Sequence, residues 1–351
     1  MRKAIILLLT AALLSPEGEI LPAPEPELSA QCAVLADGEG QILLEENGDE
    51  QHLIASTTKL MTALVALEHS DPEDPVEIPA ECCGIEGSSM YLQEGERYTV
   101  RELLTGLLLA SGNDAALALA AHCGGTEERF VSWMNEKAER LGMKGSHFAN
   151  PHGLDDPEHY GTAADLACLM AACLKVPELA DLLAKEQALI REQYYVNHNK
   201  LLGSCPGCLG GKTGYTKAAG RCLVSACERD GTRLICVTLN APDDWNDHKN
   251  LYDWGFARYV TRDVFRSLSY SLPVYGGTEK EILLTADPLV LCLPKDAQLR
   301  LRVELPRYVL APVRAGETGG RVTVSWQGRE LGAAALRFRD EVKAEEKKHE
   351  R

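Results

Sequence analysis

The order in which strand-like and helix-like patterns follow one another constrains the fold of this chain more than any other feature. An alternating segment at residues 33–45, interrupted by the turn Asp37-Gly38-Glu39-Gly40, predicts a β-hairpin at the start of the folded part. Helical patterns follow from Ser56, and strand-like runs return at 222–227 and 233–240. A block of helices enclosed by strands from both ends indicates an α/β domain over residues 31–260.

Several of the predicted helices have recognisable ends. Thr99 and Glu102 form a capping box, Gly124-Gly125 stops an alanine-rich helix, Thr126 is an N-cap, and Pro177 opens a helix. The predicted helical segments are 56–68, 99–110, 113–123, 126–141, 162–174, one from 177 onward, and 243–260.

The pattern changes beyond Thr261. Hydrophobic residues alternate with polar ones at 299–305 and again at 322–326, and glycine-containing turns separate the runs. Residues 261–340 are therefore predicted to form a small all-β domain. The charge-mixed tail 341–351 has no apolar stripe and is expected to be frayed. Two domains also suit a length of 351 residues.

The N-terminus has the character of an export signal. Arg2 and Lys3 precede an apolar run from Ala4 to Leu14, which is too short to span a bilayer, and a Pro- and Glu-rich stretch follows. Residues 1–30 are interpreted as a signal peptide and linker, with cleavage near Ala30, and the protein as exported to the cell wall or the outer face of the membrane. The alternative is an uncleaved signal that tethers the protein to the membrane.

Charge and cysteine content exclude several classes of protein. The net charge of −16 argues against a nucleic-acid binder and against electrostatic attachment to anionic lipid. Twelve cysteines in 351 residues are too few for a disulfide-built scaffold, and most lie in apolar patterns where cysteine acts as a small hydrophobe. Cys205-Pro-Gly-Cys208 has redox or zinc spacing, but no second ligand pair accompanies it, which favours a local disulfide or two free thiols over a metal site. No cofactor is expected.

Three short motifs carry the chemistry. Ser56-Thr57-Thr58-Lys59 begins a predicted helix, Ser111-Gly112-Asn113 lies between two helices, and Lys212-Thr213-Gly214 heads a predicted strand. Taken singly, these are an N-cap and two turns. Together and in this order they match the S-x-x-K, S-x-N and K-T-G set of penicillin-recognising serine enzymes.

The spacing accounts for an activated serine. Residues three apart share a helix face, so Lys59 can place its amine beside the Ser56 hydroxyl and remove its proton when neutral. Burial beside Lys212 would lower the pKa of Lys59. Ser111 would extend the proton path to the leaving amine, and Asn113 would orient Lys59 and the substrate amide.

The substrate-facing groups follow from the third motif. The backbone N–H groups of Ser56 and Tyr215 would form an oxyanion hole, each donor being worth about 3 kcal/mol in the transition state. Lys212 with the hydroxyls of Thr213 and Thr216 suits a substrate that ends in a carboxylate. Gly214 completes the motif.

Other suggestive residues are given structural roles. His152 lies in Asn-Pro-His-Gly turn chemistry near the site. His198 and His248 have no metal-ligand spacing, and no metal is expected. Trp245 and Trp254 are predicted to be core residues of one amphipathic helix.

Longer segments resemble the D-alanyl-D-alanine carboxypeptidases, the low-molecular-mass penicillin-binding proteins. They are IASTTKLMTALVALE at 54–68, GSSM at 87–90, ASGNDAA at 110–116, FANPHGL at 148–154 and GKTGYTKAAG at 211–220. The resemblance implies a penicillin-binding and β-lactamase-like transpeptidase domain, made of a helical cluster and an antiparallel sheet, followed by the all-β accessory domain.

The resemblance also implies the reaction. The partners would be peptidoglycan stem peptides ending in D-Ala-D-Ala, with β-lactams as covalent inhibitors. Ser56 matches the acyl-ester nucleophile, Lys59 the general base, Ser111 the second active serine and Lys212 the substrate-binding lysine. Two departures stand out: no amphipathic helix ends the chain, and Gly112 offers no side-chain contact.

Three alternatives remain at this stage. A serine β-lactamase needs a second base, commonly in a Glu-x-x-Leu-Asn segment, but Cys236 stands where that glutamate would precede Val237-Thr238-Leu239-Asn240. A D,D-endopeptidase acting on crosslinks would use the same acylation groups. An inactive wall-binding protein would not need Ser56, Lys59 and Lys212.

Overall fold

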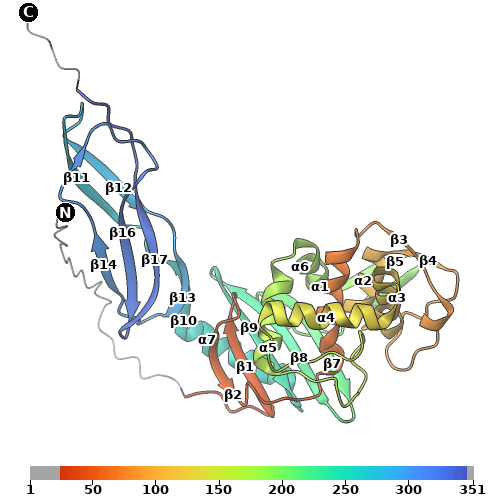
Figure 1. Cartoon of the computed structure of the whole chain (residues 1–351). Helices are drawn as coiled ribbons and strands as arrows, with labels where there is room; N and C mark the ends of the chain where they lie inside the picture. Colours follow the sequence, from red (N-terminus) through yellow and green to blue (C-terminus); the bar gives the residue numbers. More distant parts are fainter. Residues whose placement is uncertain (1–23, 346–351) are drawn as a thin grey trace, which may run out of the picture. The chain divides into compact units, whose positions relative to one another are not determined.

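Two separate hydrophobic cores divide the chain into two units. The computed structural model describes residues 24–345, so residues 1–23 of the signal peptide and linker predicted at 1–30 lie outside the described residues. Residues 24–258 form the first unit and residues 259–345 the second, each around its own core (Figure 1). The domain boundaries predicted from the sequence remain a prediction, and each unit is described by itself.

A five-stranded antiparallel sheet in the order β2-β1-β9-β8-β7 forms the centre of the first unit. Its strands are β1 (Cys32–Asp37), β2 (Ile42–Glu46), β7 (Cys208–Thr216), β8 (Gly220–Arg229) and β9 (Thr232–Leu239). The predicted hairpin and the two predicted later strands are confirmed. The first strand of this unit, β1, pairs with its last strand, β9.

Helices cover both faces of this sheet (Figure 1). Alternate residues of β9 face opposite sides, as in any strand: Ile235, Val237 and Leu239 join the large core with helix α5 (Ala163–Leu174). Thr238 instead contacts His248 on helix α7 (Asp244–Arg258). Burial on both faces explains why β1 is buried at all six positions.

The remaining helices of the first unit gather beside the sheet. They are α1 (Lys59–His69), α2 (Val100–Leu109), α3 (Asn113–Gly124), α4 (Glu127–Leu141) and α6 (Pro177–Ala184). The predicted helix from Ser56 is corrected: residues Ala55–Thr58 form a 3-10 turn, and the α-helix begins at Lys59. A second 3-10 turn spans Ala80–Cys82.

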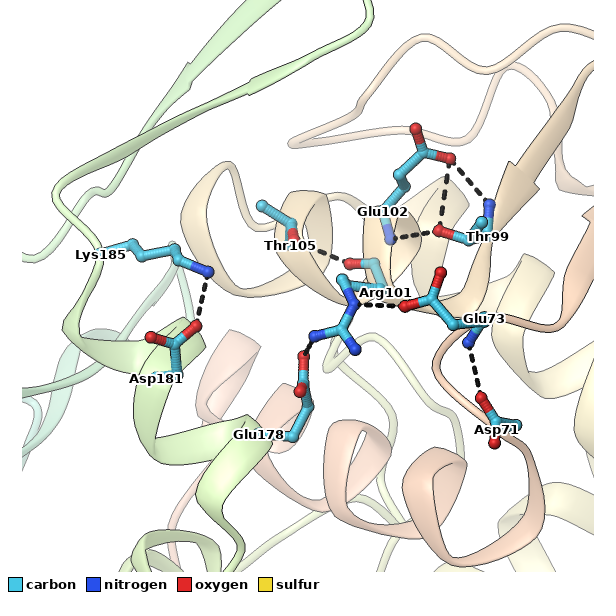
Figure 2. Close-up of polar contacts among 9 residues, drawn as sticks. All are labelled: Asp71, Glu73, Thr99, Arg101, Glu102, Thr105, Glu178, Asp181 and Lys185. Carbon is cyan, nitrogen blue, oxygen red and sulfur yellow. Dashed lines mark hydrogen bonds and ion pairs between the residues drawn. The ribbon is translucent and has the colours of Figure 1, made fainter.

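Helix α2 shows how side chains fix a helix start (Figure 2). The Thr99 hydroxyl accepts from the Glu102 backbone N–H while the Glu102 carboxylate accepts from the Thr99 N–H, which confirms the predicted capping box. Arg101 pairs with Glu73, which follows α1, and with Glu178 on α6. This arginine thus ties the first turn of α2 to two other segments.

Several strands were not predicted from the sequence. Lys212-Thr213-Gly214 does not head a strand but lies within β7, whose first half contains Gly210 and Gly211 and a register shift after Cys208. Because glycine has a low strand propensity, the sequence pattern does not predict this half of the strand. Two short hairpins, β3 (Pro75–Glu77) with β4 (Arg97–Thr99) and β5 (Gln187–Ile190) with β6 (Gln193–Val196), were also missed.

The second unit is all-β, as predicted. A six-stranded sheet has the order β14-β16-β17-β12-β11-β15, and β10 pairs with β13. The strands are β10 (Tyr259–Asp263), β11 (Ser269–Tyr275), β12 (Glu281–Ala286), β13 (Val290–Pro294), β14 (Arg300–Glu304), β15 (Val309–Leu310), β16 (Thr318–Trp326) and β17 (Arg329–Phe338).

Residues at both ends of the described chain, outside the folded range predicted from the sequence, make ordered contacts. The Ser29 hydroxyl and N–H bond the Asp247 carboxylate at 2.7 and 3.0 Å. Val342 pairs with Val313 and is buried in the second core, so the expectation of a frayed tail is wrong for its first residues. Within residues 24–345, no helix has the length and apolar character needed to cross a membrane.

Candidate active site

The first motif places a lysine amine against a serine hydroxyl. Ser56 lies in the 3-10 turn and Lys59 is the first residue of α1, so the three-residue spacing puts both on one face. Lys59 Nζ is 2.8 Å from Ser56 Oγ. Ala55, just before the serine, has a φ of +47°, a strained value for alanine that sharpens this turn.

Two oxygen acceptors hold the other side of the lysine amine. Lys59 Nζ lies 2.7 Å from Asn113 Oδ1 and 2.7 Å from the backbone oxygen of His152. The side chain is completely buried. Burial, and then the nearby charge of Lys212, hold the pKa of Lys59 well below its ordinary value, while Asp114 opposes the shift.

The second motif lies at the junction of α2 and α3. Ser111 has a φ of +60° and is buried, and Asn113 begins α3. Asn113 Nδ2 donates to the Glu86 oxygen at 2.7 Å, and its backbone N–H donates to the Ser88 oxygen at 2.8 Å. Asn113 therefore links Lys59 to the segment 86–88. The Ser111 hydroxyl makes no hydrogen bond to any residue in the described range.

The third motif runs along the edge strand β7, directly beside the serine turn. A β-carbon on Gly214 would lie 3.0 Å from the Ser56 nitrogen and 3.0 Å from Ala55 Cβ, which is tighter than ordinary side-chain contacts, so glycine favours this close approach. Lys212 is buried, its Nζ donates to the Thr213 oxygen at 2.8 Å, and burial lowers its pKa to about 7. The strand thus brings Gly214 to the serine turn, and its Lys212 is near enough to act on the pKa of Lys59.

The two threonines expected to face a substrate carboxylate differ in their surroundings. Thr213 is half-buried, whereas the Thr216 hydroxyl donates to Asp155 Oδ1 at 2.7 Å and accepts from the Ala219 N–H. A carboxylate beside Thr216 disfavours a second one there. Thr213 is therefore better placed than Thr216 to meet an anionic substrate.

Comparison with known proteins identifies the family. The family model of the peptidase S11 D-alanyl-D-alanine carboxypeptidases matches residues 20–243, which contain all three motifs. The chain belongs to this family.

Individual relatives agree along most of the chain. The D-alanyl-D-alanine carboxypeptidase DacF of Bacillus subtilis is 31% identical over 90% of this chain and 86% of its own length. DacB2 of Mycobacterium tuberculosis is 38% identical over 69% of this chain and 88% of its own length. The crystal structure of penicillin binding protein 5 from Haemophilus influenzae superposes with a TM-score of 0.74 at 31% identity, covering 92% of this chain and 99% of that one.

These findings establish the class of enzyme. The protein is a serine-type D-Ala-D-Ala carboxypeptidase of the penicillin-binding protein type, with a transpeptidase-like α/β domain followed by a β-rich domain. Its family acts in peptidoglycan metabolism on peptides ending in D-Ala-D-Ala, binds penicillin, and is extracytoplasmic.

Sequence reasoning missed Asp114 of the carboxypeptidase. This buried carboxylate accepts from the Met90 and Leu92 N–H groups at 2.9 and 3.1 Å and from the Ser89 hydroxyl at 2.6 Å. It fixes residues 89–92, directly after the residues that Asn113 contacts. A β-carbon on Gly112 would lie 2.9 Å from Asp114 Oδ1 and 3.1 Å from Met90 Cγ, which explains the glycine there. The available signal was an acidic residue in the first turn of α3.

A second group that was missed supports the serine turn. His159 is buried; its Nδ1 accepts from the Ala149 N–H, so its Nε2 carries the proton and donates to Thr58 Oγ1 at 2.7 Å. Thr58 in turn donates to the Ala55 oxygen at 2.7 Å. Burial lowers the pKa of His159 to about 4, so the ring is neutral at pH 7.

The other histidines and the tryptophans take varied positions in the carboxypeptidase. His152 contributes its backbone oxygen to Lys59, and His248 on α7 forms hydrogen bonds with Ser225 on β8 and Thr238 on β9. Trp245 and Trp254 are not core residues, which corrects the sequence prediction: both are half-buried beneath arginine side chains. No group of three or more potential ligands suited to a metal ion occurs within the described part of the chain.

Proposed function

We propose that this carboxypeptidase removes the terminal D-alanine from peptidoglycan pentapeptide stems through an acyl-Ser56 intermediate. The observation that carries the proposal is the contact of 2.8 Å between the amine of the completely buried Lys59 and the hydroxyl of the half-buried Ser56. Ser56 attacks the carbonyl of the penultimate residue, D-alanine leaves, and water then hydrolyses the ester.

The hydrogen-bond partners of Lys59 support its role as general base. Asn113 Oδ1 and the His152 backbone oxygen are acceptors only, so each takes one N–H of the amine. A neutral amine has two N–H groups and one lone pair, and the lone pair then faces the Ser56 hydroxyl. The depressed pKa of Lys59 favours this neutral form. Two fixed acceptors thus aim the base at the nucleophile.

The remaining groups are assigned to the substrate. The backbone N–H groups of Ser56 and Tyr215 form the oxyanion hole, supported by the close approach of Gly214 to the serine turn. Lys212 and Thr213 bind the terminal carboxylate. Thr216 contributes less to this binding, because its hydroxyl already donates a hydrogen bond to Asp155. Ser111 passes a proton to the leaving amine. Asn113 orients Lys59.

The cellular setting is part of the same proposal. Stem peptides of the wall are the substrates and β-lactams are covalent inhibitors that acylate Ser56. The protein is exported by the segment 1–30, and residues 31–260 carry the activity beside an accessory domain at 261–340. A membrane tether would exist only through an uncleaved signal.

A diacylated tripeptide ending in D-Ala-D-Ala tests the proposal, together with a labelled penicillin. We expect release of one D-alanine and a stable covalent adduct on the Ser56 peptide. Ser56→Ala should lose both, and Lys59→Ala should slow acylation by about 10²–10⁴-fold. Ser132→Ala, on the exposed side of α4, serves as the control.

The outcomes separate the alternatives. Rapid turnover of penicillin without peptide cleavage would indicate a β-lactamase. Cleavage of crosslinked dimers in preference to the tripeptide would indicate an endopeptidase. An adduct on a residue other than Ser56 would contradict the assignment of the nucleophile, and the absence of both activities would indicate a protein that only binds the wall.

A further inference from the structure

Three cysteines lie together outside the acylation site, where β7 begins. Cys205 and Cys208 flank the turn that leads into β7, and Cys227 is the register partner of Cys208 on β8. The Cys227 thiol is within hydrogen-bonding reach of the Cys205 sulfur. All twelve cysteines, which fall inside the described residues, are free thiols.

A fixed guanidinium faces the Cys205 sulfur. Arg229 Nη2 lies 3.7 Å from Cys205 Sγ, while Nη1 bonds Asp253 at 2.8 Å and Nε donates to the Pro206 oxygen at 3.2 Å. The two anchoring contacts keep the positive charge beside the sulfur. A neighbouring cation is the arrangement that stabilises a thiolate and makes a cysteine nucleophilic.

The acidity of Cys205 is unlike that of the cysteines around it. The hydrogen bond from Cys227, followed by that from Arg229, lowers the pKa of Cys205 to about 6 against the effect of burial. Burial raises the pKa of Cys208 to about 11, and the contact with Cys205 raises that of Cys227. Cys205, which faces the guanidinium, is thus the member of the group in which the thiolate form is favoured.

We propose that this cluster is a thiol–disulfide exchange site, with Cys205 as the attacking thiolate, Cys227 as the resolving thiol and a low-molecular-mass disulfide as the substrate. Cys205 is 4% exposed and Cys227 is completely buried, so Cys205 is the one of the two that has any contact with solvent. The site is separate from the acylation groups and does not rest on the function proposed for them.

The exchange balances in two steps. The Cys205 thiolate attacks one sulfur of the donor disulfide, which forms a mixed disulfide and releases one donor thiolate. Cys227 loses its proton to solvent and attacks Cys205 Sγ, which forms the Cys205–Cys227 bond and expels the second donor thiolate. The protein is oxidised by two electrons and the donor is reduced to two thiols.

The surroundings favour Cys227 over Cys208 as the second thiol. The Cys208 sulfur is directed to the Gly210 oxygen at 4.0 Å, whereas the Cys227 sulfur lies 3.1 Å from the Pro206 oxygen, next to Cys205. The bond would join the turn before β7 to β8 and fasten the start of the strand that carries Lys212.

Alkylation of the full, reduced chain tests the thiolate. Peptide mapping after brief treatment with iodoacetamide from pH 5 to 9 should show Cys205 reacting with a midpoint near pH 6. Cys83, which is more exposed and has a raised pKa, should react more slowly at pH 6.5. Arg229→Gln should slow the Cys205 reaction severalfold at pH 6.5, and Arg233→Gln, which removes a neighbouring pair with Glu228, should not.

Oxidised glutathione tests the pairing. The unsubstituted chain should yield a linked Cys205–Cys227 peptide and two glutathione molecules, and Cys208→Ser should behave in the same way. Cys227→Ser should retain one glutathione on Cys205. A Cys205–Cys208 bond, a lasting adduct on the unsubstituted chain, or no reaction at Cys205 would overturn the proposal. Mapping of the unsubstituted chain decides the matter even if a variant fails to fold.

Discussion

At the scale of single residues, two buried basic groups of the carboxypeptidase have lowered pKa values: that of Lys59 lies well below its ordinary value, and that of His159 is about 4. Lys59 is aimed at Ser56 by two acceptors, and His159 holds Thr58, whose hydroxyl holds the Ala55 oxygen. Desolvation disfavours the charged form of each group. Because burial shifts these pKa values, the structure predicts how the rate of peptide cleavage depends on pH.

The lowered pKa of Lys212 predicts how peptide cleavage responds to alkaline pH. Above about 7 the free enzyme loses the positive charge on Lys212, so kcat/KM for a peptide with a free carboxylate should fall about 10- to 100-fold by pH 9. Below that range the rate should decline only as Lys59 becomes protonated. Stopped assays across pH 5–9 measure both limbs.

The same peptide with a C-terminal amide is the control. It has no carboxylate for Lys212 to attract, so its alkaline decline should be absent. If both peptides gave the same profile above pH 7, Lys212 would not be the carboxylate-binding cation.

His159 predicts a defect in acylation rather than in substrate affinity. His159→Leu removes the donor to Thr58, which loosens the serine turn, and should lower the acylation rate about tenfold while costing roughly 1–3 kcal/mol of unfolding free energy. His159→Gln keeps an N–H donor and should recover much of the rate.

Penicillin acylation by stopped flow and urea unfolding separate the two effects. His147→Leu, a half-buried histidine of the same segment, should leave the acylation rate near that of the unsubstituted enzyme. Equal losses of rate in His159→Gln and His159→Leu would show that the donor is not what matters.

At the scale of elements, the site exists because an edge strand passes close to a turn. β7 has β8 on one side only, and its glycine at 214 lets the strand approach the Ser56 nitrogen. A side chain at this position would press on Ala55 and the Ser56 nitrogen, and we expect it to separate the proposed oxyanion donors from the proposed nucleophile. The approach is a property of packing between elements rather than of either element alone.

Gly214→Ala tests this spacing. Its backbone is not in the left-handed region, so the expected loss arises from contact with Ala55 and Ser56 alone. We expect acylation to fall at least tenfold, as for loss of an oxyanion donor, with a small change in unfolding free energy. Gly203→Ala, with open space around the new β-carbon, is the matched control and should keep full activity. An active Gly214→Ala would refute the argument from close approach.

At the scale of the whole molecule, the proposed acylation groups and the thiol cluster lie in residues 24–258. This unit has its own core, separate from the core of residues 259–345.

A chain ending after Arg258 should therefore fold and react with penicillin at a rate within about threefold of the full chain, because no proposed catalytic group is removed. Labelled penicillin and circular dichroism measure the two properties. A folded but unreactive truncation would show that the β-rich unit contributes to the reaction.

The sequence by itself determined the class of fold and the class of enzyme, because both depend on patterns of residues that are close together in the chain. Periodicity identifies hairpins and helices, and the threonine cap of α2 is visible as Thr99 and Glu102. Ser56 and Lys59 share a face by spacing alone. The first half of β7 could not be predicted from the sequence, because Gly210 and Gly211 can adopt many backbone conformations and so give no strand pattern.

Only the tertiary structure decided which residues from distant parts of the chain contact one another. His152 offers a backbone oxygen, which no side-chain pattern can reveal, and Asp114 and His159 act on segments distant in sequence. The same holds for Cys227 and Arg229, which reach Cys205 across paired strands. Burial and the pKa shifts that it produces depend on everything packed around a group, so they appear only once the whole chain has folded.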